Sequence, residues 1–171
     1  MEKAALKEHR RHSTADKPFS YYISNIPEYF PNAPMHWHKE FELNVILEGE
    51  GDFVTGDIHF TAYKGDIVLT PPDMLHAVYQ HDDKRCVYDT LDLDGSMLGS
   101  RDNDRAADAF IAPLILGAYS IETHITPEHC YYSELLTTAE NMISAAKGDT
   151  PLLDMLIKSE LLRVMFLSLI H

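Results

Sequence analysis

The chain has 171 residues, a length typical of one compact domain. Its composition, 45% hydrophobic and 24% charged, is that of an ordinary globular protein and excludes a disordered or collagen-like chain. Its 27 acidic and 14 basic residues give a formal net charge of −13, and a surface this negative repels the phosphates of nucleic acid.

Residues 1–18 form a polar segment that differs in charge from the rest of the chain. The first 17 residues carry five basic and three acidic side chains, whereas the whole chain is strongly acidic. They contain no apolar stretch of the kind found in a secretory signal. We therefore expect a flexible N-terminal arm, although a terminus without any role would have the same composition.

Residues 19–100 have the pattern of a small antiparallel barrel or sandwich. They are rich in Tyr, Val, Ile, Phe and Thr, and turn signals interrupt them every 8–12 residues. A hairpin is predicted over Asp52–Tyr63 with its turn at Gly56–Asp57, where glycine accepts a positive φ. Further strands are predicted at Ile67–Thr70, Met74–Gln80 and Arg85–Asp94.

Residues 101–171 change to helical spacing. Helices are predicted over Asp104–Leu116, Pro127–Ala146 and Pro151–His171, with a short strand or extended link at Ile121–Thr126. The last helix is apolar around most of its circumference, which favours burial against a second subunit or a further domain. A helix that only covers the barrel is the alternative. The candidate dimerisation residues are Leu153, Leu156, Leu161 and Val164.

The last helix and the cysteine count also indicate where the protein is located and whether the chain is a piece of a longer protein. Charged residues interrupt it, so it is not expected to span a membrane. Two cysteines are too few for a disulfide framework, which favours a reducing cytoplasm. Because the chain stops without a polar tail, we expect a piece of a longer protein.

Histidine is over-represented, with ten residues in the chain, and one group has ligand spacing. His36 and His38 lie two apart, so on a strand both rings face the same side. On a straight strand Glu42 would lie about 13 Å beyond, so we expect a tight turn at Lys39–Glu40 that returns its carboxylate to the imidazoles. With His76 the donors suit Zn, Fe, Mn, Ni or Cu, although a hydrogen-bonded core network is the alternative.

Strand parity assigns further residues around this group. Four candidate ligand-binding residues share its face: Asn44, Ile46, Val78 and Gln80. Trp37 has the opposite parity and is expected to pack behind the sheet. The other seven histidines are scattered and are predicted to lie on the surface: His9, His12, His59, His81, His124, His129 and His171.

Two segments resemble the sequence motifs of the cupin superfamily. His36-x-His38-x3-Glu42-x6-Gly49 is similar to the first motif, and Gly65-x5-Pro71-x-Asp73-x2-His76 is similar to the second. The resemblance implies a double-stranded β-helix, or jelly-roll, barrel, mainly β with C-terminal α. It also implies a divalent metal such as Zn, Ni, Fe or Mn on His36, His38, Glu42 and His76. The departures from the motifs, which affect turns rather than ligands, are Phe30, Asp73 and Gln80.

The wider layout of arm, cupin barrel and leucine-rich helices resembles the N-terminal half of AraC-type transcriptional regulators. The helical part of this resemblance rests on Tyr132–Leu136 and Ser159–Arg163. It implies a sensor that is not an enzyme, binds a small effector, often a sugar, and forms a homodimer. DNA would be bound by a helix-turn-helix domain that is absent from this chain. Two alternatives remain, a metal-dependent cupin enzyme of the isomerase or dioxygenase type and a cupin interaction module without ligand.

Overall fold

The computed structural model describes residues 2–99, 104–150 and 152–169. Its strands are β1 (Phe19–Ile26), β2 (Asn32–His36), β3 (Phe41–Thr55), β4 (Ile58–Tyr63), β5 (Ile67–Thr70), β6 (His76–Gln80), β7 (Cys86–Leu93) and β8 (His124–Ile125). Its helices are the short turns η1 (Lys3–Leu6) and η2 (Gly95–Leu98), the π-helical turn η3 (Ala107–Ile111), α1 (Ala112–Ile115), α2 (Tyr132–Ala146) and α3 (Leu152–Ser168).

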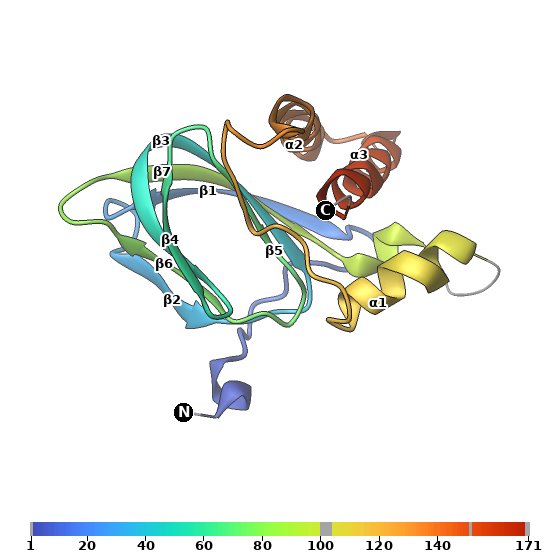
Figure 1. The fold of residues 1–171 in the computed structure, drawn as a ribbon, viewed down its shortest axis with the longest axis horizontal. Coiled ribbons are helices and arrows are strands. Elements are labelled where there is room, and N and C mark those ends of the chain that lie inside the picture. The colour runs from blue at the N-terminus through green and yellow to red at the C-terminus, as the bar shows by residue number, and fades with distance from the viewer. Residues whose placement is uncertain (1, 100–103, 151, 170–171) are drawn as a thin grey trace.

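The strands form two antiparallel layers that share the long strand β3 (Figure 1). One layer has the order β1-β7-β3-β5-β8, and in the other β6 pairs with both β2 and β3 while β4 pairs with β3. The N-terminal part of β3 pairs with β5 and β7, and its C-terminal part pairs with β4 and β6. The two layers enclose the barrel interior. The predicted fold class, mainly antiparallel β followed by α, is therefore confirmed.

Strand β3 shows why these residues form a two-faced sheet. Phe41, Leu43 and Val45 are buried on the face that packs against the helices, while Ile46 points into the barrel. The alternation ends at a register shift between Ile46 and Glu48, which leaves Leu47 39% exposed. The alternation of the two faces therefore holds up to Ile46 and ends at Leu47.

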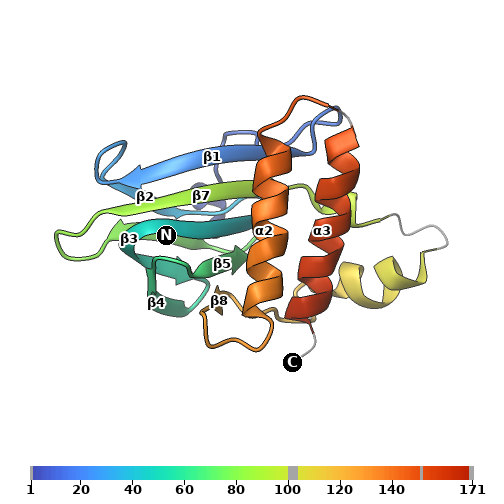
Figure 2. The same cartoon turned by 90° about the horizontal axis from the view of Figure 1, so that it is seen from above.

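The described residues form two apolar cores, one on each side of the first layer. The smaller core fills the barrel interior and includes Ile46, Phe53, Val78 and Tyr88. The larger core lies on the outer face of that layer, where α2 and α3 cross it side by side (Figure 2). The helices therefore share the larger core with the outer face of the barrel.

Most predicted elements are present, with shifted ends. The hairpin turns at Gly56–Asp57 as predicted, with Thr55 paired to Ile58. Helix α2 begins at Tyr132 rather than Pro127, because the preceding residues form turns in which the His129 amide donates to the Thr126 carbonyl. The predicted first and last residues of the final helix, and the predicted boundary at residues 100 and 101, lie outside the described residues.

Helix α3 corrects part of the predicted dimer surface. Leu161 and Val164 are each 1% exposed and belong to the chain's own core, so they are not available to a second subunit. Leu153 is partly buried against the same core, and Leu156 is 39% exposed. The error arises because an almost uniformly apolar helix gives no sequence signal for which side faces inward. No helix among the described residues is long and apolar enough to cross a membrane.

The N-terminal arm lies against the barrel (Figure 1). Trp37 does not pack behind the sheet as predicted. Its indole N–H donates to the Lys3 carbonyl at 2.7 Å, and the ammonium groups of Lys3 and Lys7 lie over its ring. The predicted flexibility of this arm stays a prediction.

Candidate metal and ligand site

Four side chains predicted as metal ligands converge inside the barrel. Ligand atoms of His36, His38, Glu42 and His76 all lie within 4.8 Å of one another. His36 comes from the end of β2, Glu42 from the start of β3 and His76 from the start of β6. The turn predicted between His38 and Phe41 is present, and it carries the chain from one layer to the other.

The glutamate is the centre of this cluster. Glu42 Oε2 lies 3.5 Å from His38 Nε2 and 3.5 Å from His76 Nε2. Burial raises the pKa of Glu42, but the positive charge that His76 and His38 carry when protonated, 3.5 Å away, outweighs it, so that the pKa falls well below its usual range. Burial likewise lowers the pKa of His76, and the Glu42 carboxylate more than reverses this effect. The carboxylate is therefore ionised and able to bind a cation.

Two of the histidines are already oriented as metal ligands. His36 Nδ1 donates to the Pro34 carbonyl at 2.7 Å, and His76 Nδ1 donates to the Met74 carbonyl at 2.9 Å. In the neutral form of each ring, the form that binds a metal, this leaves Nε2 without a proton and facing the cluster. Metal-binding histidines typically donate their other ring N–H in this way.

Buried nitrogen atoms without hydrogen-bond partners also suit metal binding. Both ring nitrogens of His38 and Nε2 of His76 have no hydrogen-bond partner, although these residues are only 4% and 3% exposed. A buried polar atom without a partner is costly. A divalent ion bound by the lone pairs of Nε2 would remove most of this cost. The residues present therefore fit the metal that the cupin resemblance implies.

Asp73 replaces a glycine of the second cupin motif without disturbing the turn before His76. It stands where the motif has glycine, and its φ of 60° is the left-handed conformation that aspartate accepts better than most residues. Its amide donates to the His38 carbonyl at 2.8 Å. The turn before His76 is therefore tied directly to another residue of the cluster.

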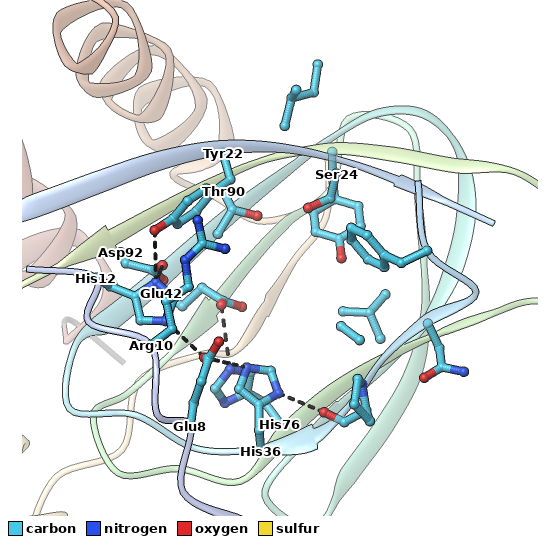
Figure 3. Close-up of a pocket in the computed structure, with 17 residues that line it drawn as sticks. Glu8, Arg10, His12, Tyr22, Ser24, His36, Glu42, His76, Thr90 and Asp92 are labelled. Atoms are coloured by element: carbon cyan, nitrogen blue, oxygen red, sulfur yellow. Dashed lines mark hydrogen bonds and ion pairs between the residues drawn. The ribbon is translucent and has the colours of Figure 1, made fainter. Parts of the chain in front are cut away.

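A cavity of about 480 Å³ opens beside the cluster, between the two layers (Figure 3). Its lining is both polar and apolar. The charged and polar residues include Glu8, Arg10, His12, His36, Glu42, His76, Thr90 and Asp92. The apolar residues are Ile23, Phe30, Ala33, Pro34 and Val78. Ser24, Asn32, Tyr22 and Tyr88 complete the wall.

The structure separates the four predicted ligand-binding residues. Val78 lines the cavity, whereas Ile46 is buried in the barrel core. Asn44 is 1% exposed and does not line the cavity; its amide donates to Glu42 Oε1 at 2.7 Å, and its carbonyl accepts from the Thr90 hydroxyl. Asn44 thus fixes a cluster residue. Gln80 lies away from the cavity and donates to the Lys84 carbonyl.

Sequence reasoning missed four acidic and basic residues that line this site: Glu8, Arg10, His12 and Asp92. His12, predicted to be on the surface, is 6% exposed and bonds Asp92 at 2.6 Å and Glu8 at 2.9 Å. Burial lowers its pKa, but the two carboxylates dominate and raise the pKa to about 11. The parity of β7 places Asp92 and Thr90 on one face, which was a usable signal. Nothing in the arm's sequence indicates that Glu8 and His12 enter the barrel.

Comparisons with known proteins agree with this architecture. The family described as AraC-like ligand binding domain matches residues 17–165. The "Uncharacterized HTH-type transcriptional regulator YdeC" of Bacillus subtilis (strain 168) is 27% identical over 89 residues, which are 52% of this chain. The chain matches only 31% of the length of that relative.

Similar solved structures include a cupin protein from Bacteroides fragilis, with 20% identity, a TM-score of 0.43, and coverage of 48% of this chain and 71% of that one. A predicted oxalate decarboxylase from Thermotoga maritima has 20% identity, a TM-score of 0.41, and coverage of 54% and 74%. The DMSP lyase DddQ from Ruegeria pomeroyi has 23% identity, a TM-score of 0.40, and coverage of 51% and 41%.

Proposed function

The chain belongs to the AraC-like ligand-binding domain family, and from this premise we propose that it is the effector-sensing domain of a cytoplasmic DNA-binding transcription regulator. The curated relative named as an HTH-type regulator supports this assignment. We assign DNA binding to a part of the regulator other than this domain, because a net charge of −13 is unsuited to phosphate contacts.

The observation that carries the proposal is the cavity of mixed polar and apolar lining beside the histidine cluster. Its volume suits a small molecule. Its polar side chains offer carboxylates, imidazoles and a guanidinium to the hydroxyl or carboxyl groups of an effector, and Phe30 and Val78 offer apolar contact to its carbon skeleton. A sugar is the effector class that the family resemblance suggests.

We assign a divalent metal to His36, His38, Glu42 and His76. When bound, such an ion supplies positive charge and open coordination positions for effector oxygen atoms. The protein's own part is to hold the donors in place. Asn44 orients Glu42, and backbone carbonyls orient His36 and His76. The donor set does not select among Zn, Ni, Fe and Mn.

We further propose that the domain forms a homodimer through one face of α3. Five exposed apolar side chains, defined here as the α3 stripe, lie along one side of the helix, and each is three, four or seven residues from another member: Leu152, Met155, Leu156, Leu162 and Phe166. This spacing is that of a helix packing on another helix. An exposed apolar stripe of this kind marks an interaction site.

A metal-dependent enzyme is the second candidate, because the donor set adjoins an open cavity. Glu40, a further carboxylate between the cluster residues His38 and Glu42, is not placed to act as a general base. Glu40 does not line the cavity, and one of its oxygens accepts a hydrogen bond from Ser13 at 2.7 Å. We therefore propose a sensor without catalytic activity.

Elemental analysis of the purified protein tests the metal assignment. We expect close to one transition-metal ion per chain, lost in His38→Ala and retained in His59→Ala, which removes an exposed histidine outside the cluster. Circular dichroism would verify that both variants fold. Equal metal content in wild type and His38→Ala would contradict the site.

Trp37 fluorescence tests the sensor assignment, since it is the single tryptophan and lies between two cluster residues. Wild type is titrated with a panel of pentoses, hexoses and small hydroxy acids, and each bound compound is followed by NMR. We expect saturable binding of one class, weakened at least tenfold in Val78→Asp, with the compound recovered unchanged. Turnover of the compound would instead favour the enzyme.

A further inference from the structure

The N-terminal arm brings a carboxylate to the histidine cluster that the cupin motifs do not contain. Glu8 Oε2 lies 3.5 Å from His36 Nε2 and 2.9 Å from His12 Nε2. The side chain of Glu8 is 28% exposed and points toward His36 in the cavity (Figure 3). Its partner atom on His36 is the nitrogen that faces the cluster, because the other ring nitrogen is bonded to Pro34.

The distance from Glu8 to His36 is that of two ligands on one ion. With bonds of about 2.1 Å, neighbouring ligand atoms lie roughly 3.0 Å apart in an octahedral site and 3.4 Å apart in a tetrahedral one. Glu42 lies 3.5 Å from its two histidine partners, and Glu8 lies at the same distance from His36. The arm carboxylate thus stands at ligand distance from one histidine of the cluster, whereas Glu42 does so from two, and Glu8 lies outside the four residues whose ligand atoms are all within 4.8 Å of one another.

The backbone of the arm is bonded to the segment that carries the histidines. The Trp37 amide donates to the Leu6 carbonyl at 3.1 Å, and the Glu8 amide donates to the Trp37 carbonyl at 2.9 Å. Since Trp37 separates His36 from His38, these two bonds hold Glu8 in register with both. At the other end of the arm, the Asp92 carboxylate binds His12 at 2.6 Å.

We propose that Glu8 is an additional ligand of the metal ion, supplied by the arm, so that barrel and arm bind the ion together. This inference rests on the proposed metal site and goes beyond it. Glu8 can contribute to metal affinity only while the arm lies on the barrel. By linkage, the metal strengthens arm docking by the same factor by which the docked arm strengthens metal binding.

Metal affinity in variants of the arm tests the proposal. Zn²⁺ and Co²⁺ dissociation constants are measured by competition with a chromophoric chelator for wild type, Glu8→Gln and Glu2→Gln. Glutamine retains hydrogen-bonding capacity toward His12, so Glu8→Gln preserves arm docking while removing the anionic donor. Glu2 is an exposed carboxylate of the same arm and serves as the matched control. We expect Glu8→Gln to weaken binding at least tenfold and Glu2→Gln to leave it unchanged.

Two further readouts do not depend on affinity alone. The visible absorption of the Co²⁺-loaded protein should change in Glu8→Gln, because the number of ligands falls, and should be unchanged in Glu2→Gln. Trypsin should cleave the arm at Lys3, Lys7, Arg10 and Arg11 more slowly when Zn²⁺ is added to wild type, and this protection should be lost in Glu8→Gln.

The outcomes distinguish failure of the Glu8 inference from failure of the proposed metal site. If wild type binds metal and Glu8→Gln has the same affinity, spectrum and protection, Glu8 is only a partner of His12 and the inference is wrong, while the proposed site stands. If wild type binds no metal in chelator competition, both the site and the inference are overturned.

Discussion

Gly49 marks the point where β3 leaves one layer of the barrel and enters the other. Its φ is +74°, and a Cβ placed there would lie 1.7 Å from the Arg85 carbonyl oxygen. The conformation alone disfavours other residues, and the backbone contact excludes any side chain. The first cupin-like motif therefore requires glycine at this position, because β3 passes here in direct contact with the backbone of Arg85, the residue before β7.

Alanine substitution separates these two effects. Gly117 has a similar φ of +73° but nothing within 4 Å of its would-be Cβ. We expect Gly117→Ala to cost about 1–2 kcal/mol of unfolding free energy, from conformation alone. Gly49→Ala adds a clash that moves backbone and should cost about 3 kcal/mol or more. Urea denaturation of both variants checks this, and equal costs would contradict the steric argument.

The residues of the site differ in how far the sequence could predict them. Strand parity and one tight turn bring His36, His38 and Glu42 together, and the resemblance to the second cupin motif adds His76. Glu8 and His12 lie in a segment with no periodicity, and their place depends on contacts with Trp37 and Asp92. Contacts between segments that are distant in the sequence leave no local pattern from which they could be predicted.

At the scale of elements, α3 has two apolar faces with different roles. Leu161 and Val164 face the barrel and are 1% exposed, while the α3 stripe is on the outside, with Phe166 64% exposed. The sequence predicted the helix and its burial but not which leucines serve which face, because both faces have the same residue types. Only the position of the barrel determines which of these leucines are buried and which are exposed.

Substitutions on the two faces should therefore have opposite consequences. Phe166→Asp places a charge on the α3 stripe and should convert the proposed dimer to monomer in light scattering, with the melting temperature of the monomer retained. Ser144→Asp, which adds the same charge at an exposed position of α2, should leave the dimer intact. Leu161→Ala removes core contacts and should cost about 2–5 kcal/mol of unfolding free energy. A wild type that is monomeric at high concentration would contradict the dimer.

At the scale of the whole molecule, the barrel and the helices are joined by polar as well as apolar contacts. The Tyr21 hydroxyl on β1 donates to Asp89 on β7 at 2.6 Å, and the Lys147 ammonium after α2 lies 3.8 Å from Asp89 and over the Tyr21 ring. Burial and the Asp89 carboxylate raise the pKa of Tyr21, so the hydroxyl remains a donor. These contacts lie on the same side of the layer as the larger core.

A shared core predicts that the molecule unfolds as one unit and that the site stabilises all of it. Trp37 fluorescence reports on the cluster, and circular dichroism at 222 nm reports mainly on α2 and α3. We expect both signals to change at one melting temperature, because the helices cannot leave without exposing the outer face of the first layer.

Metal at a hundredfold excess over its dissociation constant adds about 2.7 kcal/mol to the free energy of unfolding. For a chain of this length, this raises the melting temperature by roughly 5–11 °C. The rise should be the same in both signals and absent in His38→Ala. If the helices melt several degrees below the tryptophan signal, or if metal raises the melting temperature of that signal alone, the site and the helices are not coupled. A sensor whose helices respond to the barrel would then lack its physical basis.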